Sequence, residues 1–202
     1  MKRLLDILIA SIAFLILFPV FIYTAFKVRR HLGEPIFFYQ ERPGKDGQLF
    51  KMIKFRSMKD VCDAQGNPLS DEERITPFGQ KLRSTSVDEM PQLLNVIKGD
   101  MSIVGPRPQL SEFMKHYSEQ QKRRHHVKPG MTGLAQISGR NHLSWEQKFR
   151  LDVWYVDHQS LYLDFKIMAK TVKVMRSKEG VDQPGMIGAE AFKGTFHKNK
   201  EH

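Results

Sequence analysis

The sequence predicts an α/β protein that is mainly helical and that begins with a membrane anchor. Residues 7–26, ILIASIAFLILFPVFIYTAF, contain no charged residue and no histidine. Residues 36–58 alternate in the manner of two strands joined by glycine-containing turns. The later segments have mostly helical patterns separated by glycines and prolines. We therefore expect an anchor (1–32), one domain (33–180) and a polar, glycine-rich tail (181–202) that is mobile.

The apolar segment is long enough to match a membrane. Its 20 residues would form a helix about 30 Å long, which is the thickness of the hydrocarbon core. A signal peptide would have an apolar stretch of only about 7–15 residues and a small-residue cleavage site, and this segment fits neither feature. Pro19 lies past the middle, where a proline removes one helical hydrogen bond and its ring clashes with the carbonyl group of Leu15. We expect the helix to bend there.

Basic residues flank the apolar segment on both sides: Lys2, Arg3, Lys27, Arg29 and Arg30. Positively charged flanks stay in the cytoplasm, so both ends of the segment are expected there. The consistent topology is a re-entrant helix that enters the bilayer, bends at Pro19 and returns to the same face. A proline-kinked helix that spans the bilayer is the alternative. Under either topology, the rest of the chain lies at the cytoplasmic face of the membrane.

The composition points to an anionic partner. Lys and Arg number 32 against 22 Asp and Glu, which gives a net charge of +10. Nucleic acid, an anionic membrane surface and a phosphorylated substrate all suit this charge. The single cysteine, Cys62, excludes an internal disulfide, so nothing points to an oxidising compartment.

The strand-like region places two cations on one face. Lys54 and Arg56 are two residues apart, so they project the same way, about 7 Å apart, and face either water or an anion. A polar surface loop (60–74) follows. A short helix then ends near Ser84.

The second half of the domain is expected to contain more helix. One helix stops at Lys98-Gly99, and a short extended piece and a turn follow it up to Pro108. Residues 109–127 are typical of one basic helix, 129–140 of a glycine-rich loop and 144–180 of one or two helices. Several aromatic residues of the last segment suit helices in the membrane interface, although an ordinary core stripe is equally consistent with each taken singly: Trp154, Tyr155, Tyr162 and Phe165.

Two adjacent carboxylates, Asp88 and Glu89, lie between two arginines in this cationic chain. Ser86 and Glu89 match a capping box, which would make them an ordinary helix start. Pro91 argues against that interpretation, because it would be the fifth helical residue, where a backbone donor is normally needed. A helix that starts nearer Asp88 places Pro91 in the first turn and both carboxylates at the positive end of the helix.

The residues at this place suit phosphoryl transfer. Mg²⁺ commonly binds through one or two carboxylates together with substrate phosphate oxygens. Arg83 and Arg107, on either side of the acidic pair, can each bind phosphate oxygens in a bidentate manner. One carboxylate can then hold the metal ion while the other attacks phosphorus and forms an acyl phosphate.

Four motifs extend this interpretation to a family. The membrane segment is followed, in this order, by KFRSM (54–58), RSTSVDEMPQLLNVIKGDMSIVGPRP (83–108), PGMTGLAQISGR (129–140) and LDVWYV (151–156). In these motifs the chain resembles the bacterial sugar transferases over roughly residues 1–180. More narrowly, it resembles the small monotopic polyprenyl-phosphate phosphoglycosyl transferases, which include the enzyme that transfers phospho-N,N'-diacetylbacillosamine.

The resemblance implies an activity at the cytoplasmic face of the bacterial inner membrane. Such an enzyme transfers the sugar-1-phosphate of a UDP-sugar to undecaprenyl phosphate and releases UMP. This transfer is the first membrane step in the synthesis of an O-antigen, a capsule or a glycoprotein glycan. Inner-membrane lipids and downstream glycosyltransferases are then candidate partners, and no nucleic acid is expected to bind.

The resemblance also implies roles for particular residues. Asp88 would be the nucleophile that forms a covalent phospho-sugar intermediate, and Glu89 would bind Mg²⁺. The remaining site residues would bind phosphate groups or complete the site: Lys54, Arg83, Arg107, Arg140 and Asp152. The family has a re-entrant anchor, often with Ser-Pro at its break. This chain departs from that pattern with Phe18-Pro19, so a hydroxyl that could satisfy local backbone groups is missing.

Two other functions compete with this one. A membrane-tethered basic module that binds without catalysis is supported by KRRHHVK (122–128), and it predicts that Asp88→Asn leaves function intact. Adjacent His125 and His126 diverge on a helix and are not expected to share a metal ion. A glycosyltransferase that moves the sugar alone would release UDP in place of UMP. No motif names the sugar, and its selection is expected to depend on two loops: 60–74 and 129–142.

Overall fold

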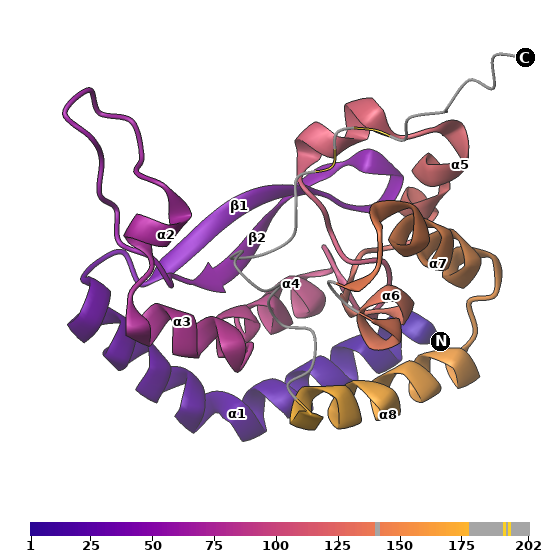
Figure 1. Cartoon of the computed structure of the whole chain (residues 1–202). Coiled ribbons are helices and arrows are strands. Elements are labelled where there is room, and N and C mark those ends of the chain that lie inside the picture. Colours follow the sequence, from indigo (N-terminus) through magenta and orange to yellow (C-terminus); the bar gives the residue numbers. More distant parts are fainter. Residues whose placement is uncertain (140–141, 178–191, 193, 195–202) are drawn as a thin grey trace, which may run out of the picture.

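A computed structural model of the chain describes residues 1–139, 142–177, 192 and 194. One long helix lies along one side of the molecule, and a β-hairpin and a group of shorter helices lie on the other side of α4 (Figure 1). The helices are α1 (Lys2–Leu32), α2 (Asp71–Arg74), α3 (Pro77–Ser84), α4 (Gln92–Lys98), α5 (Glu119–Lys122), α6 (Leu134–Ser138), α7 (Trp145–Asp157) and α8 (Leu161–Ser177).

The strands form two small sheets. The strands are β1 (Phe37–Pro43), β2 (Leu49–Phe55), β3 (Ser102–Val104) and β4 (Gly130–Thr132). Short 3₁₀ helices connect several elements: Lys45–Gly47, Val87–Glu89, Ser111–His116 and Arg123–His126. The predicted class, α/β and mainly helical, is therefore confirmed.

The anchor is a single helix that continues through Pro19. Figure 1 shows that α1 changes direction near its middle and that both halves lie against the rest of the molecule. At its first turn, the Lys2 ammonium donates to the Asp164 carboxylate at 2.6 Å, and Arg3 donates to the Val96 carbonyl group at 2.5 Å. At its other end, the Leu32 carbonyl group accepts from Arg56. Both ends of α1 are therefore bound to the same domain.

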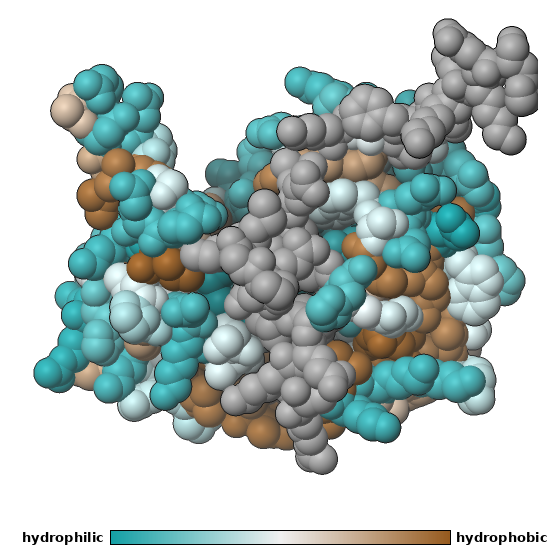
Figure 2. Space-filling view, in the orientation of Figure 1, coloured by the Kyte–Doolittle hydropathy of each residue, from teal (hydrophilic) through white to brown (hydrophobic). Residues whose placement is uncertain are grey.

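The outer side of α1 is apolar and exposed. The helix is long and apolar enough to cross a membrane. Figure 2 shows apolar surface along the lower edge of the molecule, where Figure 1 places α1. The exposed side chains include Leu8, Leu15, Ile16, Phe18, Ile22, Tyr23 and Phe26. The prediction of a long apolar N-terminal helix is confirmed.

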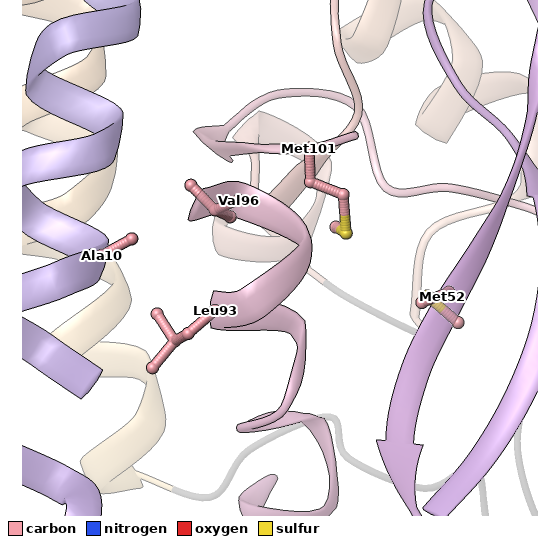
Figure 3. Close-up of a cluster of buried hydrophobic side chains, with 5 residues drawn as sticks. All are labelled: Ala10, Met52, Leu93, Val96 and Met101. Atoms are coloured by element: carbon pink, nitrogen blue, oxygen red, sulfur yellow. The ribbon is translucent and has the colours of Figure 1, made fainter. Parts of the chain in front are cut away.

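The predicted hairpin is present and packs on α4. Strands β1 and β2 are antiparallel, in a register that pairs Phe37 with Phe55 and Pro43 with Leu49. Helix α4 lies between α1 and β2, and one cluster of buried side chains joins the three (Figure 3): Ala10, Met52, Leu93, Val96 and Met101. Helix α4 ends at Gly99, whose positive φ of 109° gives the left-handed stop that Lys98-Gly99 predicted.

The prediction of a glycine-rich loop over 129–140 is wrong in part. Strand β4 pairs in parallel with β3, and α6 follows directly. Glycine is required here because two backbones touch: a Cβ atom at Gly130 would lie 2.1 Å from the Gly105 nitrogen. These glycines therefore mark close approach of two strands and not a loop.

The prediction of one basic helix over 109–127 is also wrong. The segment contains a 3₁₀ helix, then α5, then a second 3₁₀ helix. Ser118 starts α5 anew, since its side chain and that of Gln121 form a capping box. Arg124 and His125 are buried, whereas His126 is exposed. The basic run is therefore not a solvated face, although the two histidines do diverge as expected.

Two helices complete the described part of the domain. Helix α8 lies beside the first half of α1 and faces it with Asp164. Trp154, Tyr162 and Phe165 are exposed, as an interfacial location requires, but Tyr155 is buried in the core against Val104 and Ile167. The predicted mobile tail falls outside the described residues, apart from Gly194 and Phe192, whose ring packs in an aromatic cluster with Phe113, Tyr117 and Phe149.

Candidate active site

The acidic pair lies on a tight turn between α3 and α4. Asp88 and Glu89 belong to the 3₁₀ helix Val87–Glu89, and α4 begins only after Pro91. Ser86 has a left-handed backbone (φ 57°) and makes no side-chain cap, so the capping-box interpretation is wrong. The expected helix start near Asp88 is also corrected. The turn is instead closed by i→i+3 hydrogen bonds, from the Glu89 amide to the Ser86 carbonyl group and from the Met90 amide to the Val87 carbonyl group, and α4 begins at Gln92.

Glu89 is held by two cations from distant parts of the chain. Lys54, on β2, donates to Oε1 of Glu89 at 2.8 Å. Arg107, after β3, donates to Oε1 at 2.5 Å and to Oε2 at 3.1 Å, which is a bidentate contact. Burial alone would raise the pKa of Glu89, but the charges and hydrogen bonds of Arg107 and Lys54 outweigh it and hold the pKa well below its usual range. Glu89 is therefore ionised at neutral pH.

Asp88 is buried, with 7% of the residue exposed. Burial, together with the negative charge of Glu89, raises its pKa to about 6, and the cations Lys54, Arg83 and Arg107 oppose that rise. Asp88 is therefore mostly ionised at neutral pH while it is poorly solvated. A carboxylate in this state is available as a nucleophile.

The predicted phosphate-binding cations gather at this turn. Lys54 and Arg107 contact Glu89 directly, and Arg83, at the last turn of α3, lies close enough for its charge to act on Asp88. Three cations thus surround two carboxylates, and the excess of positive charge suits an anionic substrate. Arg140 lies outside the described residues, and Pro19 lies in α1 and belongs to the anchor.

Asp152 has a different place from the other predicted site residues. It lies on α7 and accepts two hydrogen bonds from Arg124, at 2.7 and 3.1 Å, in a pair that is almost wholly buried. Arg124 also donates to the carbonyl group of Arg107 at 2.7 Å. The Asp152–Arg124 pair therefore supports the backbone that carries Arg107. Arg124 was missed by sequence reasoning, because a buried arginine within KRRHHVK has no signal that separates it from exposed neighbours.

Comparison with known proteins identifies the family. Residues 1–178 match the family described as bacterial sugar transferase. The chain belongs to the bacterial sugar transferase family. This membership agrees with the four motifs and confirms the prediction that the chain is an enzyme. The alternative of a basic binding module without catalysis is set aside, and the burial of Arg124 and His125 also removes part of its support.

This sugar transferase is similar to several named proteins. It is 49% identical over 195 residues to the uncharacterized sugar transferase EpsL of Bacillus subtilis, with 96% of each chain covered. It is 39% identical over 199 residues to the undecaprenyl-phosphate galactose phosphotransferase of Salmonella typhimurium, with 89% of this chain and 41% of that protein covered. It is 40% identical over 190 residues to the UDP-glucose:undecaprenyl-phosphate glucose-1-phosphate transferase of Xanthomonas campestris, with 88% and 39% covered. The sugar transferase spans about two fifths of the latter two proteins.

Proposed function

We propose that this sugar transferase moves a sugar-1-phosphate from a UDP-sugar to undecaprenyl phosphate and releases UMP. The names of two relatives support the acceptor, since both contain undecaprenyl phosphate, and one of them names UDP-glucose as donor. The observation that carries the proposal is the buried Asp88 carboxylate beside Glu89, with three cations around the pair. This arrangement combines a nucleophile with phosphate-binding groups.

The reaction divides into two displacements at one phosphorus atom. In the first, an oxygen of Asp88 attacks the phosphorus that carries the sugar, the bond from phosphorus to the bridging oxygen of UDP breaks, and UMP leaves with the electron pair. In the second, a phosphate oxygen of undecaprenyl phosphate attacks the same phosphorus and displaces Asp88 as a free carboxylate. The shared intermediate is an aspartyl phospho-sugar, so we expect ping-pong kinetics.

The three cations bind phosphate oxygens in this proposal. Arg83 and Lys54 act on Asp88, where the transferred phosphoryl group is bonded. Arg107 reaches both Asp88 and Glu89, and its partly exposed guanidinium can turn from Glu89 to a substrate phosphate. Charged donors that are already in position stabilise the negative charge of the transition state without further reorganisation.

We propose Mg²⁺ as the cofactor, with Glu89 as its protein ligand. Oε2 of Glu89 accepts a hydrogen bond from Arg107, and a carboxylate oxygen has a second lone pair for a metal ion. Within the described ranges, no group of three or more His, Cys, Asp or Glu side chains could hold a metal ion. A single carboxylate ligand such as Glu89 suits Mg²⁺, because Mg²⁺ keeps several of its waters and also binds substrate phosphate oxygens. The ion would neutralise phosphate charge beside the carboxylates.

We propose that α1 is a re-entrant anchor and that the protein is monotopic, at the cytoplasmic face of the bacterial inner membrane. Lys2 and Arg3 bind the domain at one end of α1, and Leu32 binds it at the other. Because one folded domain lies on one side of a bilayer, both ends of α1 lie on that side. The exposed apolar side of α1 would then contact acyl chains, and Tyr162 and Phe165 of α8 would lie in the interface.

The test is a reaction of the full-length protein in detergent or lipid nanodiscs with Mg²⁺, undecaprenyl phosphate and a panel of UDP-sugars. We expect one UDP-sugar to give UMP and an undecaprenyl-diphospho-sugar. Release of UDP would mean transfer of the sugar without its phosphate. No nucleotide release with any UDP-sugar of a broad panel would contradict the proposed function.

A further inference from the structure

A further cation, Arg42, lies on the same face of the hairpin as Lys54. Residues paired across an antiparallel sheet share a face, as do residues two apart on one strand. Lys54 pairs with Phe38, and Arg42 lies four residues further along β1, opposite Phe50. Since Lys54 reaches Glu89 from this face, the face is directed toward the acidic pair. Arg42 was not among the residues that the motifs indicated.

Among the described residues, no acidic side chain forms an ion pair with Arg42. One guanidinium nitrogen, Nη2, donates to the side-chain oxygen of Gln40 at 2.5 Å, and the buried Nε has no hydrogen-bond partner among the described residues. Burial, together with the positive charge of Arg107, lowers the pKa of Arg42 to about 10. Glu89 opposes this effect, but Glu89 is already paired with Lys54 and Arg107. A second anion near Arg42 would satisfy the unused donor and relieve the repulsion between the two arginines.

Along the hairpin, Arg42 lies four residues from the level of Lys54, which is about 13 Å at the rise of a β-strand. The cations that act on Asp88 are Lys54, Arg83 and Arg107, whereas Arg42 interacts with Arg107, Glu89 and Tyr117. The charges of Arg107 and Glu89 act on both Arg42 and Asp88. The end of the hairpin that carries Arg42 also lies away from the exposed apolar side of α1 (Figure 1). An anion at this end is more easily supplied by a water-soluble ligand than by a lipid headgroup.

We propose that Arg42, together with Arg107, binds the phosphate group of the departing nucleotide. This inference rests on the proposed function and assigns a place within the same site to one of its products. When the oxygen of Asp88 bonds to the sugar-bearing phosphorus, the bridging oxygen leaves with the electron pair and becomes a terminal oxygen of UMP. The guanidinium groups of Arg42 and Arg107 are the donors for that oxygen and its neighbours.

The experiment measures how much the phosphate of UMP contributes to binding. The affinities of the full-length protein for UMP and for uridine are compared in the unmodified protein, in Arg42→Gln and in Arg42→Lys. Hydrogen bonds to charged groups are worth about 1.5–3 kcal/mol, so we expect Arg42→Gln to weaken UMP binding by about 10- to 100-fold. Uridine binding should stay unchanged. The affinity of Arg42→Lys for UMP should lie between those of the unmodified protein and Arg42→Gln, because an ammonium group keeps the charge but cannot make the bidentate contact.

The matched control is Arg150→Gln, which removes an exposed arginine that pairs with Glu146 on the surface of α7. This variant should bind UMP as the unmodified protein does. Equal weakening of UMP and uridine binding by Arg42→Gln, or unchanged UMP binding, would overturn the proposal. A raised KM for undecaprenyl phosphate with unchanged UMP affinity would also overturn it and assign Arg42 to the lipid phosphate.

Two further outcomes are a variant that does not fold and an unmodified protein that releases no UMP. Should Arg42→Gln fail to fold, as judged by its thermal unfolding curve, Arg42→Lys decides, and UMP affinity equal to that of the unmodified protein would contradict the proposal. Failure of the unmodified protein to release UMP from any UDP-sugar would refute the proposed function itself. That result is distinct from a loss of phosphate-dependent binding at Arg42, since binding is measured without turnover.

Discussion

Two arginine–carboxylate pairs meet at Arg107, one through its side chain and one through its carbonyl group, and they differ in burial. The side chains of Arg124 and Asp152 are 1% and 4% exposed, whereas those of Arg107 and Glu89 are 41% and 19% exposed. The buried Arg124–Asp152 pair, which we call the sealed pair, cannot exchange a partner without leaving a buried charge uncompensated. The more exposed Arg107–Glu89 pair, which we call the open pair, can exchange one partner for a substrate phosphate. The same chemistry therefore supports the fold at one place and binds ligand at the other.

The largest expected effect comes from breaking the sealed pair. Asp152→Ala leaves the guanidinium group of Arg124 buried without its carboxylate, so we expect the free energy of unfolding to fall by about 3–5 kcal/mol. Denaturant-induced unfolding, followed by circular dichroism, measures this loss.

Asp157→Ala is the matched control for this change. Asp157 also lies on α7 and pairs with Arg123, the neighbour of Arg124, but the two side chains are 37% and 41% exposed. An exposed pair contributes little, so we expect a loss of about 1 kcal/mol or less. Equal losses in the two variants would show that burial does not distinguish the pairs.

Removing the charge of the open pair should affect activity more than stability. In Glu89→Gln, Lys54 and Arg107 stay partly exposed, at 19% and 41%, so we expect a smaller fall in the free energy of unfolding than in Asp152→Ala. Turnover should fall by about 100-fold or more, because a carboxylate that organises the phosphate-binding cations is lost. Unfolding curves and UMP release, measured on the same preparation, check both values. A variant that is strongly destabilised yet fully active would reverse the assignment of the two pairs.

A pH dependence is also expected at the edge of the sealed pair. Burial, together with the positive charge of Arg124 and a smaller effect of His126, lowers the pKa of His125 to about 4. Between pH 6.5 and about 4 the unfolded chain therefore binds more protons than the folded protein, so stability falls as the pH falls through this window.

His125→Gln should flatten this part of the stability profile. The substitution removes the titrating ring that contacts the Gly44 carbonyl group at 3.3 Å. His126→Gln, at the exposed neighbouring position, should change the slope much less, because His126 has only a small effect on the pKa of His125. Urea unfolding between pH 4 and pH 7 gives the comparison, and identical slopes for all three proteins would contradict the expected role of His125.

Regular patterns of the sequence predicted a large part of the fold. The alternation over residues 36–58 predicted the β1–β2 hairpin, and the helix signals predicted α3, the end of α4 and one or two helices in the segment that contains α7 and α8. The parallel β3–β4 pair was missed, because strands of three residues are too short to show a periodic pattern. Glycines such as Gly130 are also typical of loops, so the sequence alone does not show that Gly130 allows two strands to approach closely.

The candidate active site was also predicted only in part, because burial and long-range contacts leave no local pattern in the sequence. Asp88 and Glu89 were found from their unusual charge in a basic chain, and their contacts with Lys54 and Arg107 join residues that are distant in the sequence. The role of Arg124 depends on burial, which the run KRRHHVK does not encode. Arg42 has no local pattern either, and its place follows only from the register of the hairpin.

The covalent step at Asp88 is the central claim, and mass spectrometry tests it most directly. The protein is incubated with Mg²⁺ and its UDP-sugar without undecaprenyl phosphate, quenched, digested and weighed peptide by peptide. The account predicts that the peptide containing Asp88 gains the mass of one phospho-sugar, that UMP is released in the same amount, and that Asp88→Asn loses both. An unmodified peptide, together with an Asp88→Asn variant that turns over at the normal rate, would contradict it.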